Sequence, residues 1–440
     1  MIKTFPEGGV HIEENKLSAS KPIRAIPLPE VIKIPISQHI GKPSKPLVKR
    51  GDMVKTGQLI ARSEGFVSAN VHATVSGKVA KIDKVYDTSG YRRDAIIINV
   101  EGDEWVDTIE RDDGLESDFS ASSKEIIQKV MEAGIVGLGG ATFPSHVKLS
   151  VPPGKKAEYL VVNGVECEPY LTADHRLMVE KGEELIVGAR IMQKALQANK
   201  ILIGIENNKP DAIENLRKIS ANYNDIEVHA LQVKYPQGGE KQLVKALLNR
   251  EVPSGGLPID VGVVAFNVGS ILAAYKAVQK NQPLIERVVT VTGKNLKEPS
   301  NFWVRLGTPV IHLLREAGGL PEDAGKVING GPMMGKALND LEAPIVKGSS
   351  GILVIPEKEA YRSEVRDCIR CSRCISVCPM NLEPYLLMAM AQKEMYDRLD
   401  QRRIMDCMEC GSCSFICPSK RPLLDYIRLG KNEAKKLKKK

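Results

Sequence analysis

The sequence predicts an α/β multidomain protein in which four folded modules follow a short N-terminal arm. Three observations lead to this prediction. Short β runs separated by glycine turns fill the region from Val31 to Val100. Strands and helices alternate from Tyr159 to about residue 285, as they do around a parallel sheet. Near the C-terminus, one cysteine pattern occurs twice in a helical region. The 440 residues leave room for three or four domains of about 100–150 residues each.

The first module is expected at residues 31–105, after an arm at residues 1–30 that is rich in proline, glycine and charge. Its expected strands are Val31–Ile36, Gly57–Arg62, Val71–Ile82 and Ala95–Val100. This rhythm predicts a small β-sandwich and resembles the barrel-sandwich hybrid of biotinyl- and lipoyl-type domains. Those carriers present a modifiable lysine at a hairpin tip. This chain has Glu64-Gly65-Phe66 there, so we expect a docking or structural role.

The second module is expected at residues 115–285 as a Rossmann-like parallel sheet with helices on both faces. Its first helix begins at Ser122, because Ser122 and Glu125 have the spacing of a capping box, and Gly134 can end it. The expected strands are Tyr159–Asn163, Ile201–Ile205, Glu227–Val233 and Val261–Asn267. Open sheets of this kind bind ligands beyond the carboxyl ends of their strands.

The third module is expected at residues 286–355, with strands Arg287–Gly293 and Val304–Leu306 and a short helix that begins after Thr308-Pro309. Its α+β layout resembles the soluble-ligand-binding β-grasp (SLBB) domain. The fourth module, residues 357–430, is expected to be helical, with Glu383–Gln401 as one helix between the cysteine motifs.

The basic tail at residues 431–440 carries six lysines and one glutamate. It fits a solvated terminus, or a patch that meets acidic lipid headgroups or an acidic partner.

Each copy of the cysteine pattern has the spacing Cys-x2-Cys-x2-Cys-x3-Cys-Pro. This spacing is typical of bacterial proteins with two [4Fe–4S] clusters, in which the fourth cysteine ligates the other cluster. One cluster is therefore predicted on Cys368, Cys371, Cys374 and Cys417, and the second on Cys407, Cys410, Cys413 and Cys378. Zinc sites usually have a longer loop between two cysteine pairs, and disulfides at this spacing would be strained. The fourth module is thus a helical, ferredoxin-like domain for two clusters.

Composition excludes several classes of protein. No run approaches the ~20 consecutive apolar residues of a membrane helix, and the N-terminus lacks the features of a signal peptide. Thiolate-ligated clusters agree with a reducing cytoplasm. The net charge of +8 is not accompanied by an aromatic-rich basic motif, so no nucleic-acid partner is expected.

Two segments ahead of the cysteines carry a second candidate site. Gly134–Pro144 is rich in glycine, which lets main-chain N–H groups approach a phosphate closely. The segment follows a helix and lacks the Rossmann glycine spacing, so a simple turn and a phosphate site both stay open. Asn163–Pro169 follows the first strand of the sheet, where its polar residues could be solvated or could bind a ligand.

These segments are similar to a known site. The sequences GLGGATFPSHVK and NGVECEP resemble the flavin and nicotinamide site of the 51-kDa NADH-binding subunits of respiratory complex I. Almost the whole chain resembles the C-subunit family of Rnf-type ion-translocating electron-transport complexes. The similar segments include FPEGGVHIEENK, YPQGGEKQLVKALLNREVPSGGLP, RVVTVTG and both cysteine motifs.

The resemblance implies that the second module binds FMN and NAD(H). The residues that it places at FMN are Gly137, Gly139, Gly140, Lys148, Asn163 and Glu166. The residues that it places at the nicotinamide dinucleotide are Phe143, as a stacking ring, and Glu168. A second loop of the same site comprises Gly238, Gly239 and Glu240, and Asn267 lies at the next strand end.

The chain departs from the complex I pattern at three positions. Val165 stands where an acidic residue is usual, Leu138 replaces an arginine, and Gly239 replaces one of two adjacent glutamates.

The implied cofactors form a chemical sequence. NADH gives up two electrons as a hydride, whereas each cluster carries one, and a flavin can accept the pair and release electrons singly. The resemblance therefore implies a peripheral electron-transfer subunit of an ion-translocating ferredoxin:NAD+ oxidoreductase complex, which is an NAD(H)-linked oxidoreductase within a translocase. It would lie on the cytoplasmic face of the cell membrane. Its partners would be membrane subunits and NAD(H), with ferredoxin reached through another subunit.

Two alternatives stay open at this point. The chain could be a cobalamin reductase within a larger assembly, because that family shares the same set of domains. It could also be a non-catalytic electron wire and assembly subunit without bound flavin.

Overall fold

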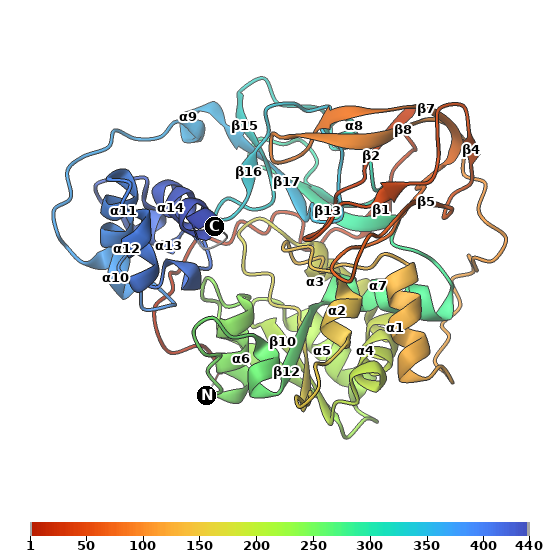
Figure 1. The fold of residues 1–440 in the computed structure, drawn as a ribbon, viewed down its shortest axis with the longest axis horizontal. Helices are drawn as coiled ribbons and strands as arrows, with labels where there is room; N and C mark the ends of the chain where they lie inside the picture. The colour runs from red at the N-terminus through yellow and green to blue at the C-terminus, as the bar shows by residue number, and fades with distance from the viewer. Residues whose placement is uncertain (1, 438–440) are drawn as a thin grey trace.

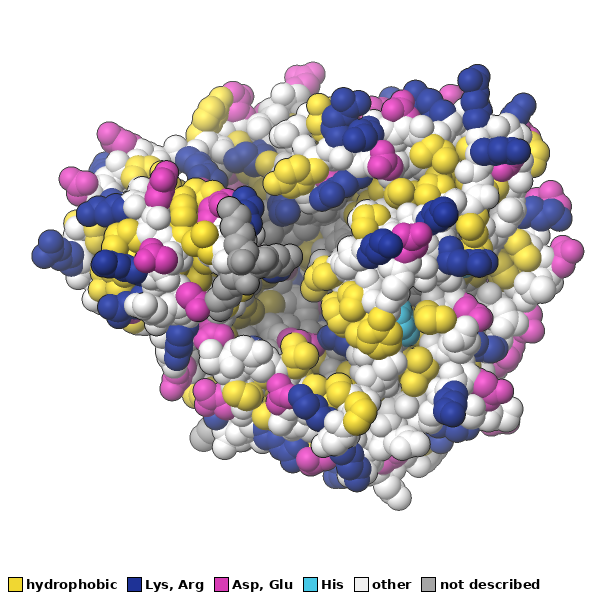
Figure 2. Space-filling view, viewed as in Figure 1, with side chains coloured by type: hydrophobic (Ala, Val, Ile, Leu, Met, Phe, Trp, Pro, Cys, Tyr) yellow, Lys and Arg dark blue, Asp and Glu magenta, His cyan; other side chains and the backbone are white. Residues whose placement is uncertain are grey.

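A computed structural model describes residues 2–437 and shows three β-containing modules beside a helical C-terminal lobe (Figure 1). The lobe, residues 357–437, lies at the left of Figure 1, and the parallel sheet with strands β10 and β12 lies below the two other sheet-containing modules. On the face shown in Figure 2, the surface is hollowed between the lobe and the rest of the molecule. Among residues 2–437, no helix combines the length and the apolar character needed to cross a bilayer.

The barrel-sandwich module consists of two antiparallel sheets. One has the order β2-β8-β7-β4 and the other β3-β5-β6. Their bounds are β2 Val31–Pro35, β3 Lys45–Pro46, β4 Met53–Val54, β5 Leu59–Arg62, β6 Val71–His72, β7 Ser76–Tyr86 and β8 Arg92–Gly102. Alternate side chains of paired strands point inward, so Ile32 and Ile34 of β2 and Ile96 and Ile98 of β8 are fully buried. These apolar side chains form the core of this module.

The parallel-sheet domain (residues 115–285) has the strand order β11-β10-β9-β12, with every neighbouring pair parallel. Its strands are β9 Tyr159–Asn163, β10 Lys200–Glu206, β11 Ile226–Leu231 and β12 Val263–Asn267. Its helices are α1 Ser123–Glu132, α2 Ser145–Leu149, α3 Ala173–Glu180, α4 Gly182–Leu196, α5 Pro210–Ser220, α6 Glu240–Leu248, η1 Pro258–Val261 and α7 Val268–Gln279. The register pairs Asn163 with Asn267. Two asparagines therefore stand side by side at the carboxyl edge of the sheet.

The β-grasp module is built on a mixed sheet with the order β1-β14-β13-β17-β15-β16. Its elements are β13 Glu286–Thr292, β14 Ser300–Arg305, α8 Val310–Glu316, β15 Ala324–Asn329, β16 Lys336–Ala337 and β17 Gly351–Pro356. The edge strand β1, Ile23–Ala25, comes from the N-terminal arm and pairs in parallel with β14. Strand β14 begins before the predicted strand Val304–Leu306, because it pairs with the whole of β13.

The C-terminal lobe contains α9 Glu357–Ala360, α10 Arg373–Ser376, α11 Pro384–Gln392, α12 Tyr396–Gln401, η2 Ile404–Asp406, α13 Ser412–Ile416 and α14 Leu423–Leu437. The prediction of one helix over Glu383–Gln401 is wrong. The chain breaks between α11 and α12, where Glu394 has φ +54°. The break lets both α11 and α12 pack on α14, with Leu387 and Leu399 buried in one core.

Helix α14 continues into the segment predicted as a basic tail. Residues 431–437 are helical, and Lys431 forms an ion pair of 3.1 Å with Glu409. The last three residues of the predicted tail, 438–440, lie outside the described residues.

Lys347, at the end of the β-grasp module, joins three modules. Its buried ammonium donates hydrogen bonds to the carbonyls of Asn70, at 2.8 Å, and Gly134, at 2.6 Å. Its main-chain N–H donates to the side chain of Gln38. Burial lowers the pKa of Lys347 to about 7. Because these bonds lie inside the protein, they fix the barrel-sandwich module and the parallel-sheet domain against the β-grasp module.

Candidate functional site

The glycine segment between α1 and α2 is a closed loop. Val136 pairs with Pro144 as an antiparallel bridge, and the Gly137 N–H donates to the Phe143 carbonyl at 2.9 Å. Gly140 has φ +116°, a conformation that favours glycine, and open space lies beside its Cα. Gly139 and Gly140 are both exposed, and Phe143 is half-buried. The loop thus presents bare main chain, which a planar or phosphorylated ligand can approach closely.

The loop meets the carboxyl edge of the parallel sheet. A Cβ built at Gly139 would lie 3.4 Å from the Cβ of Asn267. Asn267 caps α7 by accepting from the Gly269 N–H at 2.8 Å. The Asn163 amide, beside it in register, donates to the Gly238 carbonyl at 2.9 Å. The structure therefore brings the glycine loop, both strand-end asparagines and the Gly238 loop to one edge of the sheet.

Lys148 of α2 also reaches this edge. Its ammonium donates to the Glu240 carboxylate at 2.6 Å and to the Ala265 carbonyl at 3.0 Å. Glu240 opens α6 directly after Gly238 and Gly239. A cation and a carboxylate from the predicted set are thus paired to each other beside the strand ends.

The two predicted glutamates of the β9 loop have main-chain partners within the protein. The Glu166 carboxylate accepts from the N–H groups of Asp174 and His175, at 2.8 and 3.0 Å, and so caps α3. The Glu168 carboxylate accepts from the N–H groups of Met333 and Met334, at 3.1 and 2.8 Å. Burial raises the pKa of Glu168 to about 7. Glu166 therefore anchors a helix of its own domain, and Glu168 joins that domain to the β-grasp module.

Asp174 is a site residue that sequence reasoning missed. The Asn267 amide donates to its carboxylate at 2.6 Å. Burial and the nearby Glu166 carboxylate raise the pKa of Asp174. Asp174 follows the β9 loop on the first turn of α3, a position that shows no binding pattern in the sequence. Only the fold brings it under Asn267.

Four cysteines line one cavity in the C-terminal lobe, namely Cys378, Cys407, Cys410 and Cys413. The rest of the lining is largely apolar and includes Leu387, Leu424 and Ile427. Burial raises the pKa of Cys407 to about 11, so the thiol form is favoured without a cation. Iron ions would supply the positive charge that stabilises thiolates. The four sulfurs and their apolar surroundings fit a [4Fe–4S] cluster.

The other four cysteines gather at the surface of the lobe. Burial raises the pKa of Cys374, and the nearby Cys417 and Cys368 raise it further, which shows that these thiols are close together. Cys368 and Cys371 are exposed. The structure therefore places Cys417 with the first motif and Cys378 with the second, the arrangement that the crossed ligand sets need.

The cysteine-lined cavity adjoins the glycine–glutamate loop. The Tyr235 hydroxyl donates to the Cys410 carbonyl at 2.7 Å. A Cβ at Gly239 would collide with the end of the Met408 side chain. Cys167, predicted as a structural residue, is half-buried between these parts and accepts from the Gly238 N–H at 3.4 Å. The buried cysteine set is thus adjacent to the parallel-sheet domain, whereas Cys368 and Cys371 face solvent.

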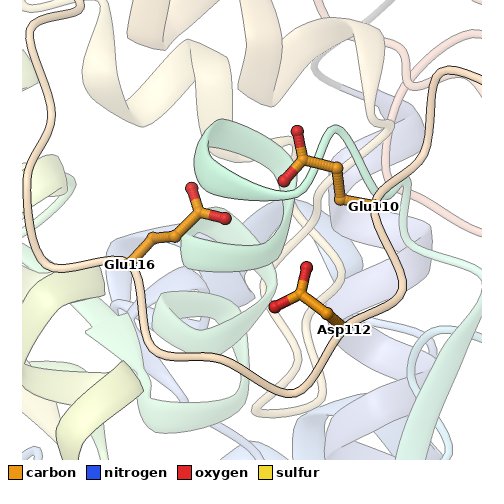
Figure 3. Close-up of side chains that lie close together, drawn as sticks. All are labelled: Glu110, Asp112 and Glu116. Carbon is orange, nitrogen blue, oxygen red and sulfur yellow. The ribbon is translucent and has the colours of Figure 1, made fainter.

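A group of three carboxylates lies away from this site. Glu110, Asp112 and Glu116 point toward one another from the linker ahead of α1, with oxygens within 4.8 Å (Figure 3). The Lys280 ammonium donates to Asp112 at 3.0 Å and also to Glu116. Because a lysine already neutralises the group, we assign it a structural role.

Four protein families match consecutive parts of the chain. The RnfC barrel-sandwich hybrid domain matches residues 3–103, and the Nuo51 FMN-binding domain matches residues 130–276. The SLBB domain matches residues 288–337, and the 4Fe–4S dicluster domain matches residues 360–418. These matches confirm the predicted order of modules and the predicted cofactors, FMN and two [4Fe–4S] clusters.

Relatives of known function are similar along nearly the whole chain. The C subunit of the proton-translocating ferredoxin:NAD(+) oxidoreductase complex of Clostridium ljungdahlii is 48% identical, over 98% of this chain and 94% of that protein. The C subunit of the Na(+)-translocating complex of Acetobacterium woodii is 44% identical, over 97% and 96%. The C subunit of the ion-translocating oxidoreductase complex of Rhodobacter capsulatus is 41% identical, over 87% and 74%.

Solved structures of the NAD+-reducing [NiFe]-hydrogenase have a similar fold. The H2-reduced form gives a TM-score of 0.50 at 17% identity, over 71% of this chain and 62% of that chain. The air-oxidised form gives 0.51 at 17% identity, over 71% and 66%. At this identity the likeness shows the fold alone.

Proposed function

This chain belongs to the family of C subunits of ion-translocating ferredoxin:NAD(+) oxidoreductase complexes, and from this premise we propose that it exchanges electrons between NAD(H) and other subunits of such a complex. One observation carries the proposal. The buried four-cysteine cavity lies directly against the edge of the FMN-binding domain, through the contact of Tyr235 with Cys410. A one-electron carrier held there would adjoin the flavin domain, as stepwise electron transfer requires.

Residues at the carboxyl edge of the sheet would hold FMN. We assign this role to the bare main chain of Gly137, Gly139 and Gly140 and to Lys148 and Asn163, as the family resemblance implies. Bound FMN supplies the chemistry that accepts an electron pair and releases single electrons. Asn267 supports the glycine loop at Gly139, and Glu240 holds the Lys148 ammonium at this edge. Glu166 would act from behind, because its carboxylate caps α3.

Phe143 and the Gly238–Glu240 loop flank the open glycines, and they would contact the nicotinamide dinucleotide. The half-buried Phe143 ring can stack on a nicotinamide or adenine ring. Glu168 has both carboxylate oxygens engaged by the β-grasp module. Its proposed contact with the dinucleotide would therefore use lone pairs that these two bonds leave free.

The proposed ligand sets give the two clusters different surroundings. Cys378, Cys407, Cys410 and Cys413 would hold the buried cluster next to the flavin domain. Cys368, Cys371, Cys374 and Cys417 would hold the cluster at the surface. Electrons would then pass from flavin to the buried cluster and leave through the exposed one. The exposed cysteines are the point at which another subunit could approach.

The remaining partners follow from the family. We propose that the chain sits at the cytoplasmic face of the membrane, where NAD(H) is present and thiolate ligands stay reduced. Ion translocation would take place in membrane subunits, and ferredoxin would meet a different subunit of the complex. The relatives' names, which describe ion-translocating ferredoxin:NAD(+) oxidoreductases, support this division.

Purified protein tests the proposal. Anaerobically prepared chain reconstituted with FMN should reduce ferricyanide with NADH, and should contain FMN and iron for two clusters. In Gly139→Trp, the indole would fill the open main chain near Asn267, so FMN and activity should be lost while iron stays. Lys156→Trp places the same ring on an exposed loop and serves as the matched control. Reconstituted protein that neither binds NADH nor reduces ferricyanide would overturn the proposal, and NADH-dependent reduction of cob(III)alamin would point to the cobalamin alternative.

A further inference from the structure

Lys16, in the N-terminal arm, holds the β9 loop by three hydrogen bonds. Its ammonium donates to the main-chain carbonyls of Glu166 at 2.8 Å, Glu168 at 2.9 Å and Leu171 at 2.7 Å. An ammonium has three donors, so these bonds use its full capacity. A single side chain from a distant part of the sequence therefore gathers three carbonyls of the loop that carries the predicted glutamates.

A second lysine continues the same pattern. Lys209, which is 1% exposed, donates to the Val165 carbonyl at 2.8 Å and is held by Glu206 at 3.3 Å and Asn208 at 2.9 Å. Between them, Lys16 and Lys209 bind the carbonyls of most of the loop from Val165 to Leu171. Carbonyls bound to lysines cannot turn toward a ligand at the sheet edge.

The loop needs such support because its backbone is strained. Glu166 has φ +49° and Tyr170 has φ +71°, in the left-handed region that residues with a Cβ rarely adopt. Such conformations persist where surrounding bonds over-determine them. The Tyr170 N–H donates to the Glu14 carbonyl at 2.8 Å, so a second residue of the arm also holds the loop.

The same arm reaches the cysteine cavity. The Gly9 N–H donates to the Val377 carbonyl at 2.9 Å, and Val10 pairs with Tyr235. A Cβ at Gly8 would collide with the main chain of Cys378. The arm is thus anchored at the C-terminal lobe before it reaches the β9 loop at Lys16.

We propose that Lys16 is a positioning residue of the flavin and dinucleotide site, and that its ammonium keeps the Glu166–Leu171 loop in the cofactor-binding conformation. The inference rests on the proposed flavin site at the edge of the sheet. It adds to that site a part of the chain outside the FMN-binding domain, which begins at residue 130. Lys16 acts through the loop backbone and does not itself touch the cofactor.

Lys16→Met tests this role, because methionine has a similar length and no charge or donor. Hydrogen exchange of residues 163–171 is measured by mass spectrometry on iron-loaded, flavin-depleted protein, before and after FMN is added. Lys21→Met, on an exposed lysine of the same arm, is the matched control. We expect faster exchange of the loop in Lys16→Met and an FMN dissociation constant raised by about tenfold or more. Iron content should be unchanged, and Lys21→Met should behave as wild type.

The other outcomes separate the inference from its premise. Wild-type exchange and wild-type FMN affinity in Lys16→Met would overturn the role of Lys16. If FMN does not slow exchange of residues 163–171 in the wild type, the proposed flavin site fails and the inference fails with it. Should Lys16→Met not accumulate with iron, Lys16→Gln, which keeps an amide donor, is measured in the same way. Loop exchange and FMN affinity equal to wild type in that variant would also overturn the inference.

Discussion

The hydroxyl of Tyr235 donates a hydrogen bond of 2.7 Å to the main-chain carbonyl of Cys410. Tyr235 lies just ahead of the Gly238–Glu240 loop, and Cys410 is the second cysteine of the second motif. Both residues are buried. This one bond joins the edge of the FMN-binding domain to the segment that lines the cysteine cavity, so it helps to fix the distance between the two proposed cofactors.

Replacing Tyr235 by Phe removes the donor and leaves a buried carbonyl without it. We expect the free energy of unfolding of the C-terminal lobe to fall by about 1–2 kcal/mol. We also expect slower reduction of the clusters by NADH. Denaturant unfolding followed by cluster absorbance, and stopped-flow reduction, measure the two effects under anaerobic conditions. Tyr91→Phe, at a residue that is 61% exposed, is the control. Equal stability of Tyr235→Phe and wild type would show that the bond does not hold the lobe.

The crossed ligand sets predict which cluster each cysteine variant loses. Because Cys368 and Cys371 are exposed, an iron chelator should strip their cluster first and the buried cluster later. Cys378→Ser should abolish the slow phase although Cys378 belongs to the first motif, and Cys417→Ser should abolish the fast phase. Iron release is followed by the absorbance of the chelate. Cys167→Ser should retain both phases. Loss of the fast phase in Cys378→Ser would mean that each motif holds its own cluster.

The buried carboxyl group of Glu168 predicts a pH dependence of stability. Its folded-state pKa of about 7 lies above the ordinary value of 4.5. The folded state therefore binds the proton more tightly, and the contribution to stability is complete below about pH 4.5 and lost as pH rises through 7. Protonated Glu168 and a glutamine present the same number of carbonyl oxygens, so Glu168→Gln should melt like wild type at pH 5.5. At pH 8 the variant should melt several degrees higher, which corresponds to about 1–3 kcal/mol.

Thermal unfolding at the two pH values measures this difference. Glu322→Gln, at an exposed glutamate of the same β-grasp module, should show no pH-dependent change relative to wild type. A constant gap between Glu168→Gln and wild type at both pH values would assign the effect to packing instead of the proton.

Lys280 predicts how the acidic group of Figure 3 responds to metal ions. The lysine is 5% exposed and bonds Asp112 and Glu116. Calcium at millimolar concentration should therefore leave the melting temperature of the wild type unchanged. Lys280→Met should melt at a lower temperature, and calcium should restore part of the loss because carboxylate oxygens are its preferred ligands. Lys42→Met, which breaks an exposed pair with Glu64, is the control. Stabilisation of the wild type by calcium would contradict the prediction.

Elements that depend on neighbouring residues were predictable from the sequence. Ser122 and Glu125 form the expected capping box, and Pro210 opens α5 as expected. The break between α11 and α12 was not predictable in this way. Glu394 adopts a left-handed conformation because both helices pack on α14, and α14 lies more than twenty residues further along the chain. Local propensity carries no record of that packing.

The spacing of the cysteines alone determined that this chain holds two cubane clusters, since a chelating pattern is written in consecutive residues. The glycines and asparagines of the flavin segment likewise have their conformational and hydrogen-bonding roles in the side chain itself. Only the tertiary structure decided that Lys16 binds the loop at Glu166, that Glu168 faces the β-grasp module, and that one cluster is buried and the other exposed. Those relationships join residues far apart along the chain, and they exist only once the modules are packed together.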